Sequence, residues 1–449
     1  MGTQQDFTEG SVGRAIVLLA VPMVLEMSME SLFGIADVFF VSRLGAEAVA
    51  TVGLTESILT LLYAIAMGLS LATSAMVARR VGEKKHREAS RTAVQGIILA
   101  IVISLPLAIF GAIYARSLLK AMGASDTMRG PAGGYAVLMF GGNITIMLLF
   151  LNNAIFRGAG DAATAMRALW IANLINIVLD PCLIFGLGPF PALGVPGAAV
   201  ATNIGRGVGV AYQITLMMRS NSRVRVELRD WKLDVPVIRR LLRIALAGIF
   251  QYFVATASWL GLVRIIAIFG STALAGYTIA LRIIIFSILP SWGMSNAAAT
   301  LVGQNLGAGK PDRAERSVWL TGVCNMIFLG CVALVFIIFA RSLVRLFSID
   351  PSVIEVGADC LRLVSFGYLF YGYGMVIIQA FNGAGDTDTP TMINLGCYWL
   401  FQIPLAYALA ILFDFRERGV FIAITMAESL LAVVGILVFR TGRWKEKRV

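Results

Sequence analysis

Long runs of apolar residues, separated by short stretches of glycine, proline and charged residues, dominate the pattern along the chain. Runs such as 96–115, 323–340 and 420–439 are each about 20 residues long, the length that an α-helix needs to cross the hydrocarbon layer of a membrane. The pattern predicts an all-α membrane protein with twelve transmembrane helices. The segments are 15–41, 48–78, 93–115, 133–156, 164–187, 194–218, 240–268, 272–302, 317–340, 357–381, 389–413 and 419–440.

The composition supports this interpretation and argues against an enzyme. The chain is 58% hydrophobic and only 14% charged, whereas a soluble globular chain is about 25% charged. Its single histidine, His86, excludes most His-ligated metal sites and His-based catalytic triads. No HExxH or GxSxG motif is present. We therefore expect neither enzymatic activity nor a bound cofactor.

The basic residues predict the orientation in the membrane. Of the 37 Lys and Arg residues, 25 fall in the termini and loops of one side, 9 on the opposite side and three within helices. The positive-inside rule then places both termini in the cytoplasm of a multi-pass protein of the inner membrane. The net charge of +11 follows from this bias and from attraction to anionic lipid, so no nucleic-acid partner is expected.

The chain also matches itself at one constant offset, so that its two halves read as repeats. LGAEAVATVGL (44–54) aligns with FGSTALAGYTI (269–279), and FRGAGDAAT (156–164) aligns with FNGAGDTDT (381–389). Residues related by this offset are equivalent positions of the two repeats. Each repeat holds an even number of spans, so we expect two six-helix bundles related by a pseudo-two-fold axis along the membrane normal. The predicted parts are an N-terminal lobe (1–218), a cytoplasmic linker with an interfacial amphipathic segment (219–239), and a C-terminal lobe with a basic tail (240–449).

Acidic residues inside the first apolar segment are candidates for function, because a charge in the hydrocarbon region is costly. Glu26, Glu30 and Asp37 follow at steps of four and seven residues, which places them on one stripe of a helix. Pro22 precedes them and is a candidate hinge. For Glu26 and Glu30, contact with a wet vestibule is an equally good explanation.

The segment 164–187 carries a second polar group. Asn173, Asn176 and Asp180 share one face, and Pro181 frees the carbonyl of Ile177. Hard cations such as sodium take oxygen ligands of this kind, although a polar contact between helices is the alternative. The second repeat has apolar residues at the positions equivalent to Asp37, Asn176 and Asp180, namely Leu262, Phe401 and Leu405. We therefore expect the first repeat to hold the coupling ion.

Several motifs together resemble those of the multidrug and toxic compound extrusion (MATE) family. They are Pro22 with the DVFFV run at 37–41, VGQNLGAGK at 302–310, the paired RGAGD and NGAGD turns, and GVPGAAVAT at 194–202. The resemblance covers nearly the whole chain. It implies a pair of six-helix lobes that alternate access across the membrane and export drugs in exchange for sodium or protons.

The family's branch with an ion site in the N-terminal lobe (DinF-like) implies particular site residues. Asp37, Asn176, Asp180 and Thr202 would bind the cation, with Asp37 and Asp180 as the acidic ligands if it is sodium. Tyr135 and Asn153 would line the same cavity, and the full expected lining is Tyr135, Asn153, Glu26, Glu30, Gln251 and Arg282. Gln251 stands where another branch has an acid on the seventh helix, which argues against a second ion site.

The expected substrates are cationic and amphiphilic small molecules, and we expect a monomer in contact with membrane lipids. A lipid-linked precursor flippase is one alternative, with Arg206, Arg264 and Arg282 as basic groups, but the acids argue against it. A metabolite porter of the major facilitator type is another, and the loop ARRVGEKKHREA meets its usual signature poorly.

Overall fold

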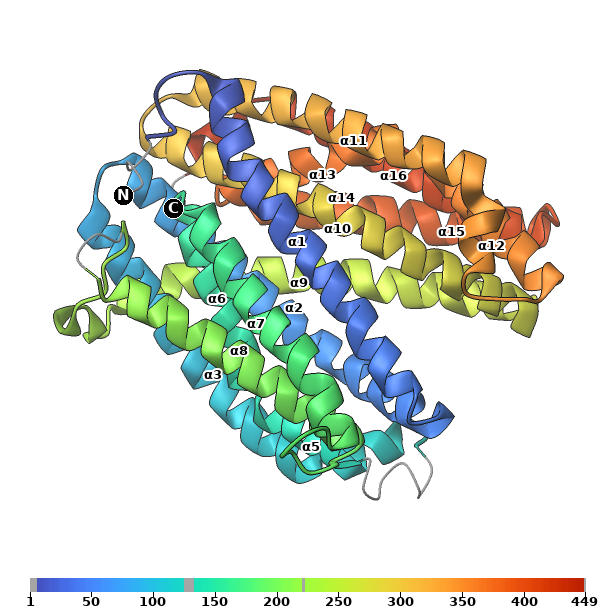
Figure 1. Ribbon diagram of the computed structural model, residues 1–449. Coiled ribbons are helices and arrows are strands. Elements are labelled where there is room, and N and C mark those ends of the chain that lie inside the picture. The colour runs from blue at the N-terminus through green and yellow to red at the C-terminus, as the bar shows by residue number, and fades with distance from the viewer. Residues whose placement is uncertain (1–5, 125–132, 220–222, 448–449) are drawn as a thin grey trace. The chain divides into compact units, whose positions relative to one another are not determined.

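The computed structural model describes residues 6–124, 133–219 and 223–447, and every regular element in these ranges is a helix, as predicted (Figure 1). Arg129, one of the basic residues counted above, and residues 220–222 of the predicted linker lie outside the described residues. The helices of the first repeat are α1 (Val12–Ser42), α2 (Ala46–Gly82), α3 (His86–Ala121), α5 (Gly133–Gly141), α6 (Asn143–Gly158), α7 (Ala162–Phe185) and α8 (Val195–Met217).

The second repeat follows the same order. A short 3-10 turn, η1 (Leu228–Trp231), precedes it, and a second one, η4 (Arg443–Glu446), ends it. Its helices are α9 (Val235–Ala267), α10 (Ser271–Gly307), α11 (Pro311–Arg345), α12 (Pro351–Ser365), α13 (Tyr368–Gly383), α14 (Asp388–Asn394), α15 (Ile403–Tyr407) and α16 (Arg416–Arg440). Two π-helical stretches, η2 (Leu395–Gln402) and η3 (Ala408–Leu412), lie on either side of α15, within one apolar span from Asp388 to Leu412.

The described residues contain twelve helical segments long enough to cross a membrane. Nine are single apolar spans, and the bent pairs α5–α6 and α12–α13 raise the number to eleven. The twelfth, α8, is less apolar, but its 23 residues extend over about 34 Å. The predicted fold class of an all-α membrane protein with twelve helices is thereby confirmed.

Two of these segments, predicted as unbroken, are bent in the structure. The bend is 46° between α5 and α6 and 60° between α12 and α13. Each lies at a glycine, and these two glycines, Gly142 and Gly367, are equivalent positions of the repeats. Hydrophobic periodicity cannot show a bend, because both halves of a bent helix remain apolar.

The chain forms two compact units, whose boundaries lie inside helices. The first unit contains Leu25–Ile249, and the second contains Asp6–Val24 together with Phe250–Val449. The cuts after Val24 and after Ile249 fall at equivalent positions, so both repeats are divided at the same place. The beginning of α1 thus belongs with the second repeat, and the beginning of α9 belongs with the first. The lobes 1–218 and 240–449 divide the sequence by its duplication and remain a prediction.

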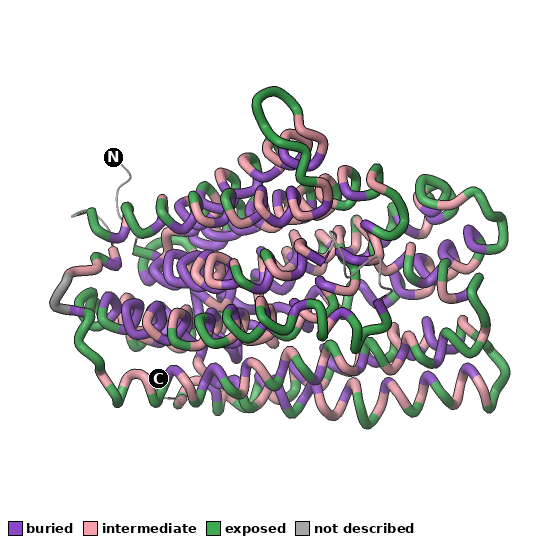
Figure 2. Tube along the Cα trace, turned by 90° about the horizontal axis from the view of Figure 1, so that it is seen from below, coloured by how far each residue is buried: buried purple, intermediate pink, exposed green. Residues whose placement is uncertain are grey.

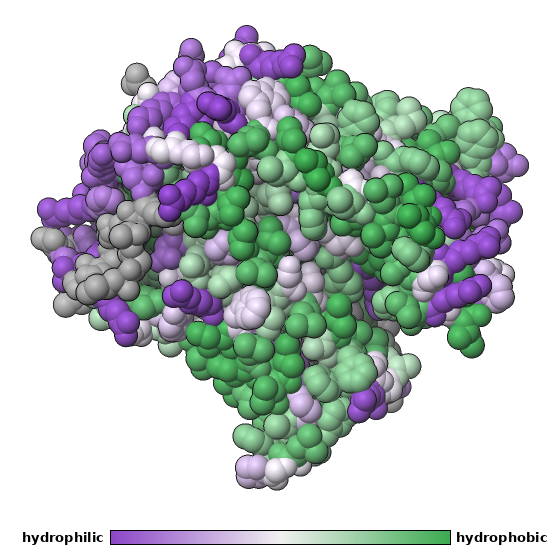
Figure 3. All heavy atoms as spheres, turned by 45° about the horizontal axis from the view of Figure 1, so that its top comes forward, coloured by the Kyte–Doolittle hydropathy of each residue, from purple (hydrophilic) through white to green (hydrophobic). Residues whose placement is uncertain are grey.

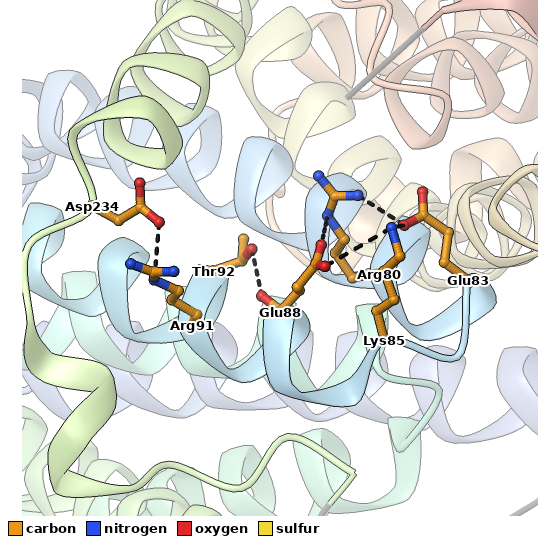
Figure 4. A network of polar contacts seen from close by, with 7 residues as sticks. All are labelled: Arg80, Glu83, Lys85, Glu88, Arg91, Thr92 and Asp234. Carbon is orange, nitrogen blue, oxygen red and sulfur yellow. Dashed lines mark hydrogen bonds and ion pairs between the residues drawn. The ribbon is translucent and has the colours of Figure 1, made fainter.

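An ion pair, drawn in Figure 4, and three hydrogen bonds attach the segment just before α9 to α3 in the first unit. The Arg91 guanidinium lies 2.9 Å from the Asp234 carboxylate. Gln95 donates from its amide nitrogen to the carbonyls of Asp230 and Lys232, at 3.3 and 3.0 Å. In return the backbone N–H of Asp234 donates to the Gln95 amide oxygen at 3.2 Å. Residues 235–239 of the predicted linker are accordingly the first turn of α9.

The same figure shows ion pairs that hold the ends of α2 and α3 together (Figure 4). Arg80 pairs with Glu83 at 2.8 Å and with Glu88 at 3.3 Å. Lys85 lies 3.2 Å from the same Glu83. These side chains are partly or largely exposed, so each pair contributes little by itself and the cluster mainly orders the turn.

In the second unit the segment before α1 is held by the start of α11. Arg313 donates to the carbonyls of Phe7, Glu9 and Gly10 at 3.1, 2.8 and 2.7 Å. Lys310 donates to the Thr8 carbonyl at 2.9 Å. Basic residues that contribute to the predicted membrane orientation therefore also hold the segment before α1.

The surface pattern is that of helices in lipid. Buried turns alternate with exposed turns along most helices (Figure 2). Large apolar side chains such as Val102, Ile113 and Val178 are more than half exposed. On the face shown in Figure 3, apolar residues cover the middle of the helices and hydrophilic residues gather at the helix ends.

Candidate cation site

Three predicted site residues meet where α7 packs against α8 in the first unit. The Asn176 amide donates to the Thr202 hydroxyl at 2.9 Å and to Oδ1 of Asp180 at 3.5 Å. Asn176 and Asp180 lie one turn apart on α7, which gives them the same face. All three side chains are buried.

Two oxygens of this group are left without a hydrogen-bond donor among the described residues. They are Oδ1 of Asn176 and Oδ2 of Asp180, and both are buried. A buried oxygen without a donor costs free energy that a bound cation, or a proton on the carboxyl, would recover. A carboxylate, an amide and a hydroxyl oxygen also form the type of ligand set that hard cations take. The residues present therefore fit a small cation.

Asp37 belongs to the same region. It lies on the part of α1 that packs in the first unit, and it is partly exposed. Its charge is within electrostatic range of Asp180 and of Arg206. The structure thus brings Asp37 near the Asn176–Asp180–Thr202 group, with Asp37 as its more accessible member.

Glu56, which was not among the predicted site residues, and Arg206, which was considered only for the flippase alternative, also lie in this region. Glu56 on α2 accepts a hydrogen bond from the hydroxyl of Tyr135 at 3.4 Å. Arg206 on α8 is buried, donates to the Tyr63 hydroxyl at 3.4 Å, and is within electrostatic range of Glu56. Glu56 lies inside the predicted segment 48–78, so the rule that singles out acids in the membrane would have identified it.

The remaining predicted residues of the first unit form a second cluster, farther toward the start of α1. The Glu26 carboxylate, fully buried, lies 2.6 Å from the Arg157 guanidinium and accepts from the Asn153 amide at 3.1 Å. Gln213 donates to the Asn153 amide oxygen. Between the clusters, Asn173 donates to Glu30 at 3.0 Å.

The predicted cavity lining therefore separates into two places. Eleven residues part Glu26 from Asp37, which corresponds to about 16 Å along α1. Tyr135 lies with Glu56 near the cation site, whereas Asn153 lies with Glu26. The spacing on α1 predicts one stripe of acids, but it could not show which partner each acid has.

Three predicted residues belong to the second unit. Gln251 is buried, and its amide oxygen has no donor among the described residues. Arg282 is exposed. Pro22 lies within α1, which continues through it as a helix, two residues before the unit boundary at Val24.

A twelve-helix membrane protein with a buried polar site inside a helix bundle has the architecture of a transporter. A family model described as MatE matches residues 22–182 and 244–408. The chain belongs to this family, as its motifs indicated, and the two matched segments lie one in each repeat.

Individual proteins of known name or structure resemble the chain over nearly its full length. The probable multidrug resistance protein NorM of Thermotoga maritima is 25% identical over 439 residues, covering 98% of this chain and 94% of that protein. A multidrug resistance MATE family transporter solved in an outward-facing conformation has a TM-score of 0.92 and 27% identity, with 100% of both chains covered.

A third similar protein is a MOP superfamily transporter from Pyrococcus furiosus. Its structure has a TM-score of 0.91 and 26% identity, with 100% of both chains covered. Its binding pocket is described as having reverse polarity, which suggests a different function for that transporter.

Proposed function

We propose that this protein is a secondary active exporter of amphiphilic organic cations, which it exchanges for sodium or protons bound in the first unit. Membership of the MatE family makes the chain a membrane transporter rather than an enzyme. The names of its relatives support small-molecule drugs as the substrates. The coupling proposal rests on one observation: the buried oxygens Oδ1 of Asn176 and Oδ2 of Asp180 have no hydrogen-bond donor among the described residues.

Either coupling ion would use the same side chains. Sodium would take oxygens from Asp180, Asn176 and Thr202, with Asp37 as the accessible carboxylate at the entrance. A proton would instead neutralise the Asp180 or Asp37 carboxyl. In both cases the negative charge of the group falls when the ion binds, which favours a drier and more closed arrangement of α1, α7 and α8.

The rest of the proposal follows from the sequence arguments. The protein acts as a monomer in the cytoplasmic membrane with both termini in the cytoplasm, and it belongs to the branch with its ion site in the N-terminal lobe. Pro22 lies close to the position where α1 passes from one unit to the other. It therefore serves as the hinge that lets α1 respond to the charge on Asp37.

The charges in the first unit argue against the flippase alternative. Recognition of a pyrophosphate lipid requires several basic groups free to meet the ligand. Arg206 is within electrostatic range of Glu30 and Glu56, and Arg157 is paired with Glu26. The acids therefore offset the basic groups of this unit.

Transport in proteoliposomes tests the proposal. We expect Asp180→Asn to reduce ion-driven export of a cationic dye to background, because the amide can neither bind a cation strongly nor accept a proton. Asp414→Asn is a matched control: Asp414 is exposed in a loop with a φ of 55°, a conformation that asparagine tolerates well. Imposing a sodium gradient or a pH gradient separately identifies the ion. Wild-type transport by Asp180→Asn would refute the proposed site.

A further inference from the structure

The second unit contains an acid near the middle of a membrane-spanning helix. Glu428 lies on α16, midway between its ends at Arg416 and Arg440. It is partly buried, and its carboxylate accepts a hydrogen bond from the Tyr398 hydroxyl at 3.4 Å. Glu428 lies inside the predicted segment 419–440, but it was not among the predicted site residues.

Glu428 has no basic partner among the described residues, a property that it shares with Asp180 but not with Glu26, Glu30 or Glu56. Glu26 pairs with Arg157, and Glu30 and Glu56 lie within electrostatic range of Arg206. The interactions of Glu428 are with tyrosine and cysteine side chains. A carboxylate at mid-membrane depth without a positive partner is costly, so this position is suited to a cation that arrives from outside the protein.

Comparison of the repeats shows that Glu428 does not make the hydrogen bond that its equivalent makes in the first repeat. The equivalent residue of the first repeat is Asn203, whose amide donates to the carbonyl of Leu138 beside the α5–α6 bend. In the second repeat the equivalent carbonyl, that of Leu363, instead accepts from the Thr425 hydroxyl at 2.8 Å. In the second repeat it is therefore Thr425 that donates to the carbonyl beside the bend, and Glu428 does not take part in this hydrogen bond.

One tyrosine is hydrogen-bonded to the carboxylate, and two more lie within electrostatic range of it. Besides Tyr398, the rings of Tyr371 and Tyr368 on α13 are within electrostatic range of Glu428. The Tyr368 hydroxyl is buried and has no hydrogen-bond partner among the described residues. Tyr398 lies on the π-helical stretch η2, and such stretches occur frequently at functional sites.

A carboxylate among aromatic rings is the arrangement that recognises organic ammonium groups. The ring faces attract a cation through their quadrupoles, and the carboxylate supplies a full opposite charge. A small hydrated ion gains less from the rings, because it would have to give up its water. The chemistry at Glu428 therefore favours a large, weakly hydrated cation over sodium.

We propose that Glu428, with Tyr398, Tyr371 and Tyr368, forms a binding site in the second unit for the ammonium group of a cationic substrate. This inference rests on the proposed export function and assigns a substrate contact to the second unit, separate from the cation site at Asp180. It also explains why an acid is present in the repeat that lacks the Asp37–Asn176–Asp180 set.

Binding of the permanently charged dye ethidium to the purified full-length protein in detergent tests the site. We expect Glu428→Gln to raise the Kd about tenfold, which corresponds to about 1.4 kcal/mol. Glu428→Asp keeps the charge and should lose less affinity. Tyr371→Leu removes one ring but keeps the carboxylate, and it should raise the Kd about threefold, in line with one cation–π contact. Fluorescence anisotropy measures each Kd, and size-exclusion chromatography confirms that each variant is folded.

Glu417→Gln is the matched control, because it makes the same change of charge at the start of the same helix. Its Kd should equal that of the wild type. The inference is overturned if Glu428→Gln binds ethidium as tightly as the wild type, or if Glu417→Gln weakens binding equally. Export of ethidium by the wild type in proteoliposomes separates the two proposals. If the wild type exports ethidium and Glu428→Gln binds it with an unchanged Kd, the export function stands but this site is refuted. If the wild type binds ethidium but does not export it under an ion gradient, the export function itself is contradicted.

Discussion

Replacing Gly68 with alanine would test the close crossing of α2 and α9 that holds the beginning of α9 in the first unit. A Cβ atom at Gly68 would lie 2.5 Å from Cγ1 of Ile249, 2.7 Å from its backbone nitrogen and 2.8 Å from the Ala245 carbonyl oxygen. Two of these three atoms are backbone, so a rotamer change cannot relieve the clash. Helix α9 would have to move away from α2.

The size of the effect follows from two opposing contributions. Alanine is favoured over glycine within a helix by about 1 kcal/mol. Overpacking a close contact costs about 1–3 kcal/mol. We therefore expect Gly68→Ala to destabilise the protein by up to about 2 kcal/mol. Gly53, also on α2, has no atom within 4 Å of its Cβ position, and Gly53→Ala should be stabilising by up to about 1 kcal/mol.

Thermal unfolding in detergent, followed with a thiol-reactive dye, measures the difference. Cys360 and Cys397 are free and buried, so they report when the helices separate. Gly68→Ala should unfold at a lower temperature than the wild type, and Gly53→Ala at the same or a higher one. Equal midpoints for the two variants would show that the crossing does not constrain α9. The same test applies in the second unit to Gly293, the equivalent of Gly68, whose Cβ would meet the Met23 carbonyl oxygen.

Two further predictions concern ion pairs of very different burial. Arg157→Met should destabilise the protein by about 3–5 kcal/mol, because it leaves the Glu26 carboxylate buried without its partner; adding Glu26→Gln should restore much of the loss in a double-mutant cycle of unfolding midpoints. If the effects of the two substitutions simply add, the pair is not coupled. At the end of the chain, a hydrogen bond to Glu315 raises the pKa of Lys445, and the contact is 2.5 Å long. Its contribution should be present below the ordinary lysine pKa of about 10.4 and disappear as pH rises through the higher pKa of the folded state. At neutral pH Lys445→Gln should therefore cost less than about 1 kcal/mol, and a larger loss that persisted above about pH 11 would contradict this account.

Much of the architecture was determined by local properties of the sequence. The number of spans followed from the lengths of the apolar runs, because a membrane sets a minimum helix length. The duplication followed from charged loop residues that recur at one offset. The contact between Asn176 and Asp180 could be expected too, since residues four apart share a helix face.

Only the tertiary structure decided which helices and side chains meet. The sequence shows Glu26, Glu30 and Asp37 on one stripe, but it does not show that Arg157 pairs with Glu26. Nor could it show that the beginnings of α1 and α9 each pack with the other repeat, because the pattern along a helix does not identify the element that it packs against. Hydrophobic periodicity indicates which face of a helix is buried away from lipid or water. The partner of each face depends on contacts between residues far apart in the chain, and Glu428 with its three tyrosines, drawn from α13, η2 and α16, is such a contact.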